Sequence, residues 1–416
     1  MQLRPGFRQT ELGPLPENWE VTTVNGLASS VRNAIVGGPF GSDLVSRDYV
    51  ADGIPVIRGQ NMGKQWITGP FVFVTSNKAD SLEANLAHPD DVVFTQRGTL
   101  GQVSLVPHQP YSRYLVSQSQ MKVTLNRATV DPVFSYYLFS GEMQQERIRQ
   151  NTIQTGLPHI NLGILRGISV PRPPLPEQRA IATALSDVGA LLTKLDQLVT
   201  KKRDLKQAAM QQLLTGQTRL PGFSAEWERQ TLANVFSISA GKSKSAYLAP
   251  GGQHWVVDMG SVSTDGKLVV SKATNYASDF LTTGDLVMPK DDIGGGGIIG
   301  KVGYIDAERT YVLGDHVYRL RATRGHSLFL SFAINGHRTN SELRKKVIGT
   351  AQLGLSRRSV NEQEIPFPPH DEQVAIASFL SDMDTEIAAL DARRDKTRAL
   401  KQGMMQELLT GRIRLV

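Results

Sequence analysis

The sequence predicts an α+β fold. Two domains of mixed short strands and helices are separated by two long antiparallel helices, which form an intramolecular coiled coil in a pseudo-twofold ring arrangement. Residues 174–220 recur as residues 369–415 at a constant offset of 195, and 23 of the 44 positions from Glu177 to Leu220 are identical. Each copy carries apolar residues at heptad spacing. The segments PENWEVTTV and SAEWERQTL, which lie ahead of the two copies, also resemble each other. These three observations predict the fold.

The composition fits a protein with a packed core and limits its chemistry. The 416 residues are 40% hydrophobic and 20% charged, and none is cysteine, which excludes disulfides, thiolate metal sites and cysteine nucleophiles. The net charge of +7 suits a nucleic-acid partner. The amino terminus lacks the apolar core of a signal peptide, and no run approaches the length of a membrane span. We therefore expect a cytoplasmic protein without a membrane segment.

The repeats divide the chain into four parts. We predict a first domain at residues 1–170, a central helix at 171–216, a second domain at 217–365 and a carboxy-terminal helix at 366–416. Prolines precede each helix, and Gly216 and Gly411 follow it. Between these signals lie about 38 residues without proline, a helix of roughly 57 Å. A helix of that length needs a long partner.

A heptad seam supplies the partner. Five apolar positions in each copy step by four and three residues: Ile181, Leu185, Val188, Leu192 and Leu195 in the first copy, and Ile376, Leu380, Met383, Ile387 and Leu390 in the second. The matched seams indicate that the two helices pair with each other. The alternative is that each helix packs only on its own globular domain.

Inside the domains, β-branched runs predict short strands, and longer amphipathic stretches predict helices. We expect strands at 92–95, 102–106, 120–125, 254–259, 266–270, 285–288, 300–305 and 316–320, and helices at 132–150 and 327–347. The first repeat helix continues as TRLPGFSAEW, whereas the second ends in IRLV, and the missing continuation RPGF stands at residues 4–7. This pattern predicts a ring cut at one junction, with Val416 near the amino-terminal segment.

The sequence contains no convincing catalytic constellation. The glycine run at 293–302 has the spacing of a phosphate loop, but Val302 stands where a Ser or Thr should bind magnesium. The segment at 240–243 has the Lys-Ser pair, but Phe236 occupies the position of the first glycine. The histidines, including His88, His159 and His316, show no metal-ligand spacing. We expect turns rather than nucleotide sites, and neither catalytic nor metal-binding residues.

These residues resemble the specificity subunit of Type I restriction–modification systems over the whole chain. The strongest match is the helix PLPEQRAIA…LSD…LKQ…QQLLTG with its second copy DEQVAIA…LKQ…QELLTG. The phrases GGPFGSDL at 37–44, GIPVIRGQNM at 53–62 and GDLVMPKDDIGGGGIIGKVGYI at 284–305 resemble target-recognition-domain sequence. The second domain shows no clear sequence counterpart of GIPVIRGQNM.

The resemblance implies a non-catalytic reader of double-stranded DNA. It implies two target-recognition domains, each binding one half of a split, asymmetric site, and helices that set the gap between the halves. It also implies two methyltransferase subunits, which carry S-adenosylmethionine, and motor–nuclease restriction subunits bound through them. The exposed glutamines of the helices are our candidates for docking these partners: Gln207, Gln211, Gln212, Gln402 and Gln406.

Base reading requires polar side chains on loops that enter a groove, and neighbouring glycines let the backbone approach DNA. The candidates in the first domain are Arg58, Gln60, Asn61, Lys64, Arg97, Thr99 and Gln102. Those in the second domain are Lys242, Lys244, Lys290, Asp292 and Lys301. At each position a phosphate contact, or no contact, remains an alternative to base reading.

Two other hypotheses remain open. The chain could be a coiled-coil scaffold joining two modules that bind carbohydrate or protein rather than DNA. It could also be an unassisted enzyme acting on DNA or RNA, with catalysis in the glycine run. Sequence-specific, salt-sensitive binding to a split duplex would separate the first hypothesis from these two.

Overall fold

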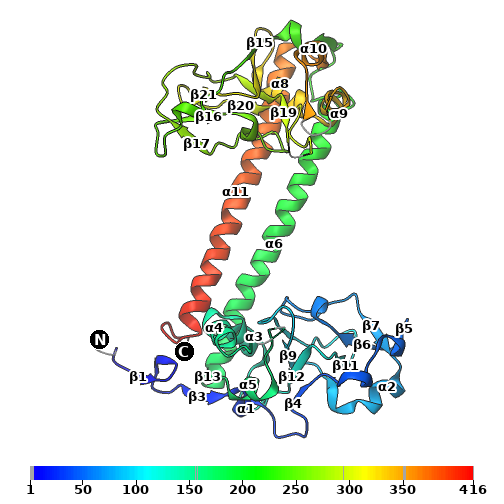
Figure 1. Ribbon diagram of the computed structural model, residues 1–416, viewed down its shortest axis with the longest axis vertical. Helices are drawn as coiled ribbons and strands as arrows, with labels where there is room; N and C mark the ends of the chain where they lie inside the picture. The colour runs from blue at the N-terminus through cyan, green and yellow to red at the C-terminus, as the bar shows by residue number, and fades with distance from the viewer. Residues whose placement is uncertain (1–3, 155, 157, 294, 350–352, 416) are drawn as a thin grey trace. The chain divides into compact units, whose positions relative to one another are not determined.

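The computed structural model describes residues 4–154, 156, 158–293, 295–349 and 353–415 (Figure 1). The chain forms two compact units. Unit 1 contains Met1–Leu195 together with Arg393–Val416, and unit 2 contains Asp196–Ala392. Unit 1 is therefore discontinuous in sequence and is completed by the end of the chain. No helix among the described residues is long and apolar enough to cross a membrane.

The two repeat helices are α6 (Leu175–Leu213) and α11 (His370–Leu408), each of 39 residues. Both begin directly after prolines, which fit the first turn of a helix but not its interior. Both are followed by a glycine with positive φ, +71° at Gly216 and +69° at Gly411, the left-handed conformation that closes helices. The predicted long helices are confirmed.

The helices pair antiparallel within each unit. In unit 2, ion pairs join Lys202 to Glu386 at 2.7 Å, Arg203 to Asp391 at 2.8 Å and Lys206 to Asp384 at 2.5 Å. In unit 1, the Lys401 ammonium lies 3.1 Å from where a Cβ on Gly189 would stand. Along α6 from Gly189 to Lys206, the neighbour in α11 moves back from Lys401 to Asp384, which confirms the antiparallel coiled coil.

The heptad positions divide between two environments. Ile181 and Leu185 lie in the core of unit 1, and Ile376 and Leu380 lie in the core of unit 2. Further along the helices, Leu195 and Ile387 are buried, whereas four positions are half-buried: Val188, Leu192, Met383 and Leu390. The end of α11, at Leu408 and Leu409, joins the same core as the start of α6. The two long helices therefore pair with each other and also pack on the globular domains. The two arrangements that the sequence left as alternatives both occur.

Unit 1 contains two main sheets. A four-stranded sheet has the order β10-β9-β12-β4 and a five-stranded sheet the order β5-β7-β6-β11-β8, in which β6 and β11 are parallel. Two-stranded pairs join β1 to β2 and β3 to β13. The strands are β1 (Phe7–Thr10), β2 (Gly13–Pro16), β3 (Glu20–Thr23), β4 (Ile35–Gly37), β5 (Tyr49–Val50), β6 (Ile54–Ile57), β7 (Val72–Val74), β8 (Leu86–Ala87), β9 (Val92–Thr95), β10 (Val103–Leu105), β11 (Tyr114–Val116), β12 (Gln120–Val123) and β13 (Ser169–Arg172). The short helices are α1 (Val24–Leu27), α2 (Ser76–Ser81), α3 (Pro132–Ser140), α4 (Glu142–Gln150) and α5 (Leu162–Gly167).

Unit 2 repeats the central part of this topology. Its four-stranded sheet has the order β15-β22-β18-β20, and its three-stranded sheet β17-β16-β21 again contains one parallel pair, β16 with β21. Two-stranded pairs join β14 to β24 and β19 to β23. The strands are β14 (Glu228–Thr231), β15 (Phe236–Ala240), β16 (His254–Val257), β17 (Lys272–Thr274), β18 (Leu286–Pro289), β19 (Asp291–Asp292), β20 (Gly303–Tyr304), β21 (Tyr311–Leu313), β22 (Val317–Ala322), β23 (Leu353–Gly354) and β24 (Glu364–Phe367). The short helices are α7 (Leu232–Val235), α8 (Ser327–Asn335), α9 (His337–Lys345) and α10 (Arg357–Asn361).

The helical segments predicted at 132–150 and 327–347 are confirmed, each as two helices broken at one glycine, Gly141 or Gly336. One local prediction was wrong, the strand at 266–270. Residues 266–270 form a turn with one isolated bridge, and the strand follows at β17. The run begins in a tight turn, in which Gly266 has φ +74° and donates to Ser263 O, and Leu268 folds back to bridge Val262.

Each unit closes on the same three-residue cluster, which we call the junction clamp. In unit 1, Trp19 Nε1 donates to Glu177 at 2.9 Å, and Arg414 binds both oxygens of Glu177 at 2.5 and 2.8 Å. Gly411 lies against Pro16 and Trp19, and Leu415 packs on the unit 1 core. The carboxy-terminal segment therefore contacts the amino-terminal segment as the ring predicts. Val416 itself lies outside the described residues.

The clamp in unit 2 uses the equivalent residues. Trp227 Nε1 donates to Glu372 at 2.9 Å, and Arg219 binds both oxygens of Glu372 at 2.5 Å. Arg219 and Arg414 are 195 positions apart, as are Glu177 and Glu372. The arginine that follows each long helix therefore clamps the glutamate that begins the other one.

One substitution should restore a pair that the duplication has lost. Lys206 pairs with Asp384 in unit 2, but the unit 1 equivalents are Lys401 and Gly189. Burial lowers the pKa of Lys401, and no carboxylate among the described residues forms an ion pair with it. We expect Gly189→Asp to raise the free energy of unfolding by about 1 kcal/mol at neutral pH, because it adds a partner and removes a helical glycine.

The pH dependence checks the cause of this gain. A lysine whose pKa is lowered by folding destabilises the native state at neutral pH. This cost shrinks as pH rises above the lowered pKa and is gone once the lysine of the unfolded chain is neutral as well. The advantage of Gly189→Asp should therefore shrink between pH 7 and pH 10, as measured by chemical denaturation. Gly189→Asn is the matched control. It also removes the helical glycine but adds no negative charge, so its gain in free energy of unfolding should not change between pH 7 and pH 10. Equal gains for both variants would contradict the ion pair.

Candidate nucleic-acid interface

The ends of five strands meet at one side of unit 1. Gly38 N–H, just after β4, donates to Gln120 at the start of β12. The end of β9 at Thr95 also pairs with Gln120, and β6 and β11 end side by side at Ile57 and Val116. We call this side the loop edge; in unit 1 it comprises residues 37–44, 58–64, 96–102 and 117–119.

Most of the first-domain candidates lie exposed on this loop edge: Gln60, Lys64, Arg97 and Thr99. Arg58 and Gln102 are half-buried, and Gln102 Oε1 accepts a hydrogen bond from Thr95 at 3.3 Å. Sequence reasoning did not select Phe40, whose side chain is 85% exposed on the same edge. An exposed aromatic ring surrounded by glycines was the available signal for it.

Asn61 does not fit the predicted role of a base reader. It is buried, and its side chain is fully occupied by the backbone. Oδ1 accepts from Arg58 N–H at 3.0 Å, and Nδ2 donates to the carbonyls of Thr68 and Pro70 at 3.0 and 2.8 Å. Asn61 therefore holds the loop that presents its neighbours.

Unit 2 builds the loop edge from the equivalent strand ends, at residues 241–247, 258–261, 290–293 and 314–316. Gly241 N–H donates to Val317, and β18 ends opposite Val317. A Cβ on Gly241 would lie 1.9 Å from Gly314 O, and a Cβ on Gly38 would lie 1.9 Å from Ser117 O. Any side chain at Gly38 or Gly241 would therefore clash with the backbone that follows the parallel strand β11 or β21. Both loop edges require glycine at this position.

The second-domain candidates split into two groups. Lys242 is exposed and Lys290 half-buried, both on the loop edge. Lys244 is only 5% exposed, with its ammonium 2.8 Å from Asp279, and this hydrogen bond is the main cause of the lowered pKa of Asp279. The Lys244 charge is thus already paired within the unit.

Asp292 and Lys301 also face the interior. Asp292 is buried in the β19–β23 pair. Lys301 Nζ donates to Asn335 O at 3.1 Å, and burial lowers the pKa of this lysine. Within the described part of the glycine run, no helix follows Lys301, and a phosphate loop requires one. The structure therefore supports neither residue as a DNA contact.

The unit 2 edge contains a hollow of about 330 Å³. Several polar residues that line it were not predicted: Ser243, Ser245, Asp258, Lys272, Asp315 and His316. Lys272 lies on β17, where the sequence predicted no strand, so no signal placed it beside Asp258. Among the described residues, no group of three His, Asp or Glu side chains can hold a metal ion.

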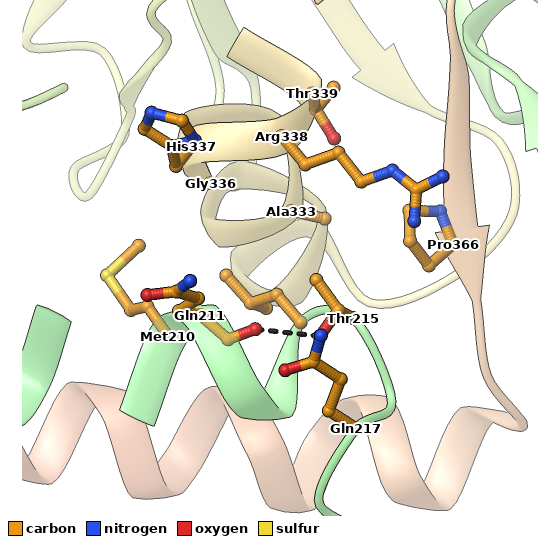
Figure 2. Close-up of a pocket in the computed structure, with 11 residues that line it drawn as sticks. Met210, Gln211, Thr215, Gln217, Ala333, Gly336, His337, Arg338, Thr339 and Pro366 are labelled. Atoms are coloured by element: carbon orange, nitrogen blue, oxygen red, sulfur yellow. Dashed lines mark hydrogen bonds between the residues drawn. The ribbon is translucent and has the colours of Figure 1, made fainter. Parts of the chain in front are cut away.

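A second cavity, of about 220 Å³, lies between the end of α6 and the α8–α9 bend (Figure 2). All five docking candidates are exposed on the long helices, and one of them, Gln211, lines this groove. The Gln211 carbonyl accepts a hydrogen bond from Thr215 Oγ1 at 2.7 Å. The lining includes Met210, Thr215, Gly336 and His337, and its chemistry is mixed polar and apolar.

The residues of this groove recur in unit 1. Six of its eleven lining residues are identical 195 positions away: Met210 and Met405, Gln211 and Gln406, Leu214 and Leu409, Thr215 and Thr410, Gly336 and Gly141, and Pro366 and Pro171. The loop edges, in contrast, share backbone geometry but few side chains. The molecule therefore combines repeated helix ends with two chemically different loop edges.

Comparison with known proteins agrees with this architecture. The family described as "Type I restriction modification DNA specificity domain" matches residues 16–205 and again residues 224–397. Two curated relatives from Methanocaldococcus jannaschii are similar over nearly their whole length. The Type I restriction enzyme MjaVIII specificity subunit is 23% identical over 96% of this chain and 94% of its own. The putative MjaX specificity subunit is 22% identical over 98% and 97%.

Solved structures share the fold. The Type I restriction–modification S subunit from M. genitalium superposes with a TM-score of 0.61 at 16% identity, covering 98% of each chain. HsdS from Thermoanaerobacter tengcongensis gives a TM-score of 0.50 at 16% identity, over 96% of this chain and 98% of its own. With both halves matched by one family, the chain belongs to the Type I restriction–modification specificity subunits and contains two copies of their DNA specificity domain.

Proposed function

We propose that this subunit reads a split, asymmetric site in duplex DNA, with one half-site for each loop edge. The observation that carries the proposal is the repeated loop edge: two units present the same strand ends, but their side chains differ. Equal geometry with unequal chemistry suits the reading of two different short sequences at one duplex. The exposed cations Lys64, Arg97 and Lys242 suit phosphate and base contacts.

The long helices fit the role of spacer and docking platform. At 1.5 Å per residue, 39 residues extend about 58 Å, and duplex DNA repeats about every 34–36 Å. The repeated groove residues suit two copies of one partner, which would be the methyltransferase subunit. Restriction subunits would join through that partner. A solved structure that addresses complex assembly of a Type I system has a TM-score of 0.57 at 16% identity, over 96% of this chain and 99% of its own.

The partner subunits, rather than this chain, would catalyse the reactions on DNA. S-adenosylmethionine would bind to the methyltransferase, and this chain would select where it acts. The proposed cellular location is the cytoplasm, where the DNA is.

Methylation mapping tests the proposal. The chain, purified together with its methyltransferase, should modify genomic DNA at one split, asymmetric motif, and binding should weaken steeply with salt. Methylation without any defined motif would contradict DNA reading. Methylation or cleavage by this chain alone would instead favour the enzyme hypothesis. A complex whose stability and activity are unaffected by DNA would favour the scaffold.

A further inference from the structure

The loop after β6 has a structural counterpart in unit 2 that the sequence does not reveal. Strands β6 and β16 each have an antiparallel neighbour, β7 or β17, and a parallel neighbour, β11 or β21. Each strand is followed by one 3₁₀ turn, Gly59–Asn61 or Met259–Ser261. IPVIRGQNM at 54–62 therefore corresponds to HWVVDMGSV at 254–262.

The residue that begins each turn is held in the same way. Arg58 has φ −124° and ψ 169°, and Asp258 has φ −126° and ψ −166°. Arg58 N–H donates to Asn61 Oδ1 at 3.0 Å, and Asp258 N–H donates to the buried Ser261 Oγ at 2.9 Å. The backbone is thus fixed identically, while the side-chain charge is opposite.

The two side chains are in different states. Asp258 folds onto its own turn: Oδ1 accepts from Gly260 N–H at 3.2 Å, and Oδ2 lies 2.5 Å from Lys272 Nζ. Arg58 is half-buried, and its Nε is shielded from solvent with no hydrogen-bond partner among the described residues. A buried donor without an acceptor is costly, and a bound acceptor would relieve that cost.

We propose that position 58, with its counterpart 258, determines which base pair each loop edge accepts, and that Arg58 reads a guanine. Guanine offers two acceptors, O6 and N7, which match the planar guanidinium fork. Asp258 provides no such fork, and unit 2 has the 330 Å³ hollow beside it. This inference rests on the proposed function and names a specificity residue within it.

A base contact explains Arg58 better than a phosphate contact. A flexible, hydrated lysine binds a phosphate as well as an arginine does, and the exposed Lys64 lies on the same loop edge. A half-buried stem on a fixed turn restricts the direction of the guanidinium. A base pair without two adjacent acceptors leaves the guanidinium fork without partners in the groove, which is the source of discrimination.

The experiment compares motifs methylated by the complex with its methyltransferase, using libraries of duplexes varied at each position. Arg58→Ala should relax the preference for one guanine in one half-site by about 10- to 100-fold and leave the other half-site unchanged. Arg58→Lys should relax it similarly, because lysine keeps the charge but loses the fork. Lys64→Ala is the control: it should weaken methylation of all sequences and leave the motif intact.

Three outcomes separate the possibilities. An unchanged motif for Arg58→Ala, with the melting midpoint of the wild type, overturns the inference. A uniform loss across all sequences also overturns it, because that result indicates a phosphate contact. A wild-type complex that methylates no defined motif refutes the proposed function instead.

Discussion

Glu372→Ala should lower the free energy of unfolding of unit 2 by about 3 kcal/mol. The Glu372 carboxylate is completely buried and holds both Arg219 and the indole N–H of Trp227. Its removal leaves Arg219 without a counter-ion, with the Ala225 carbonyl still accepting at 2.9 Å, and leaves the half-buried Trp227 indole N–H without its acceptor. This loss of free energy is at the low end for buried ion pairs, because the Arg219 side chain is 24% exposed and water screens its charge.

Calorimetry and hydrogen exchange can measure this loss. For a unit of this size, about 3 kcal/mol lowers the melting midpoint by roughly 6–12 °C. Amides of β14 and β24, which lie next to Trp227 and to the start of α11, should lose protection first. Glu372→Gln should recover part of the loss, because an amide oxygen can still accept from Trp227.

Matched variants show whether the clamp acts locally. Glu177→Ala removes the equivalent carboxylate, which is 3% exposed, and should destabilise unit 1 by a similar amount. Glu362→Ala breaks the exposed pair of Arg358 and Glu362 at 2.7 Å, and should leave unit 2 unchanged. If Glu372→Ala is as harmless as Glu362→Ala, the clamp does not stabilise the fold.

The sequence reveals the clamp only in part. The repeat shows that Glu177 is equivalent to Glu372 and Arg219 to Arg414, because each pair of identical residues is 195 positions apart. It cannot show that each arginine binds the glutamate of the other helix, because that contact depends on the ring closing. The unpaired RPGF segment predicted the closure, so the helix ends and their antiparallel direction were accessible before the structure.

The loop edges were harder to predict from the sequence, for a physical reason. The parallel pairs β6–β11 and β16–β21 join segments far apart in the sequence, and such pairing leaves no local signal. Without it, Arg58 and Asp258 could not be recognised as equivalent. Long side chains add a second difficulty: Lys301 turns inward because Asn335, which lies 34 positions away, offers a carbonyl. Residue type and a nearby glycine do not decide between exposure and burial.

Inserting four residues into each long helix should lengthen the gap in the methylated site while both half-sequences stay the same. The insertions belong between Leu195 and Asp196 and between Ala392 and Arg393, where the two units divide. Four residues add about 6 Å and slightly more than one helical turn. At about 3.4 Å per base pair, the gap should grow by one or two base pairs.

The expected effect is large, because the proposed function requires both loop edges to bind at once. On the original site, one half-site would be out of reach after insertion, and the advantage of joining two readers would be lost. Methylation of that site should fall about 100-fold, while a site with the longer gap is methylated at the original rate. Methylation mapping of the variant complex measures both.

An insertion into α6 alone is the informative control. It shifts α6 by one turn against α11 and separates ion pairs such as Arg203 with Asp391 and Lys206 with Asp384. That variant should lose stability and methylate neither gap well. If the double insertion instead leaves the gap unchanged, the paired helices do not set the spacing, although the loop edges could still read the half-sites. Because both insertions keep every loop-edge residue, a changed half-sequence would contradict the separation of reading from spacing.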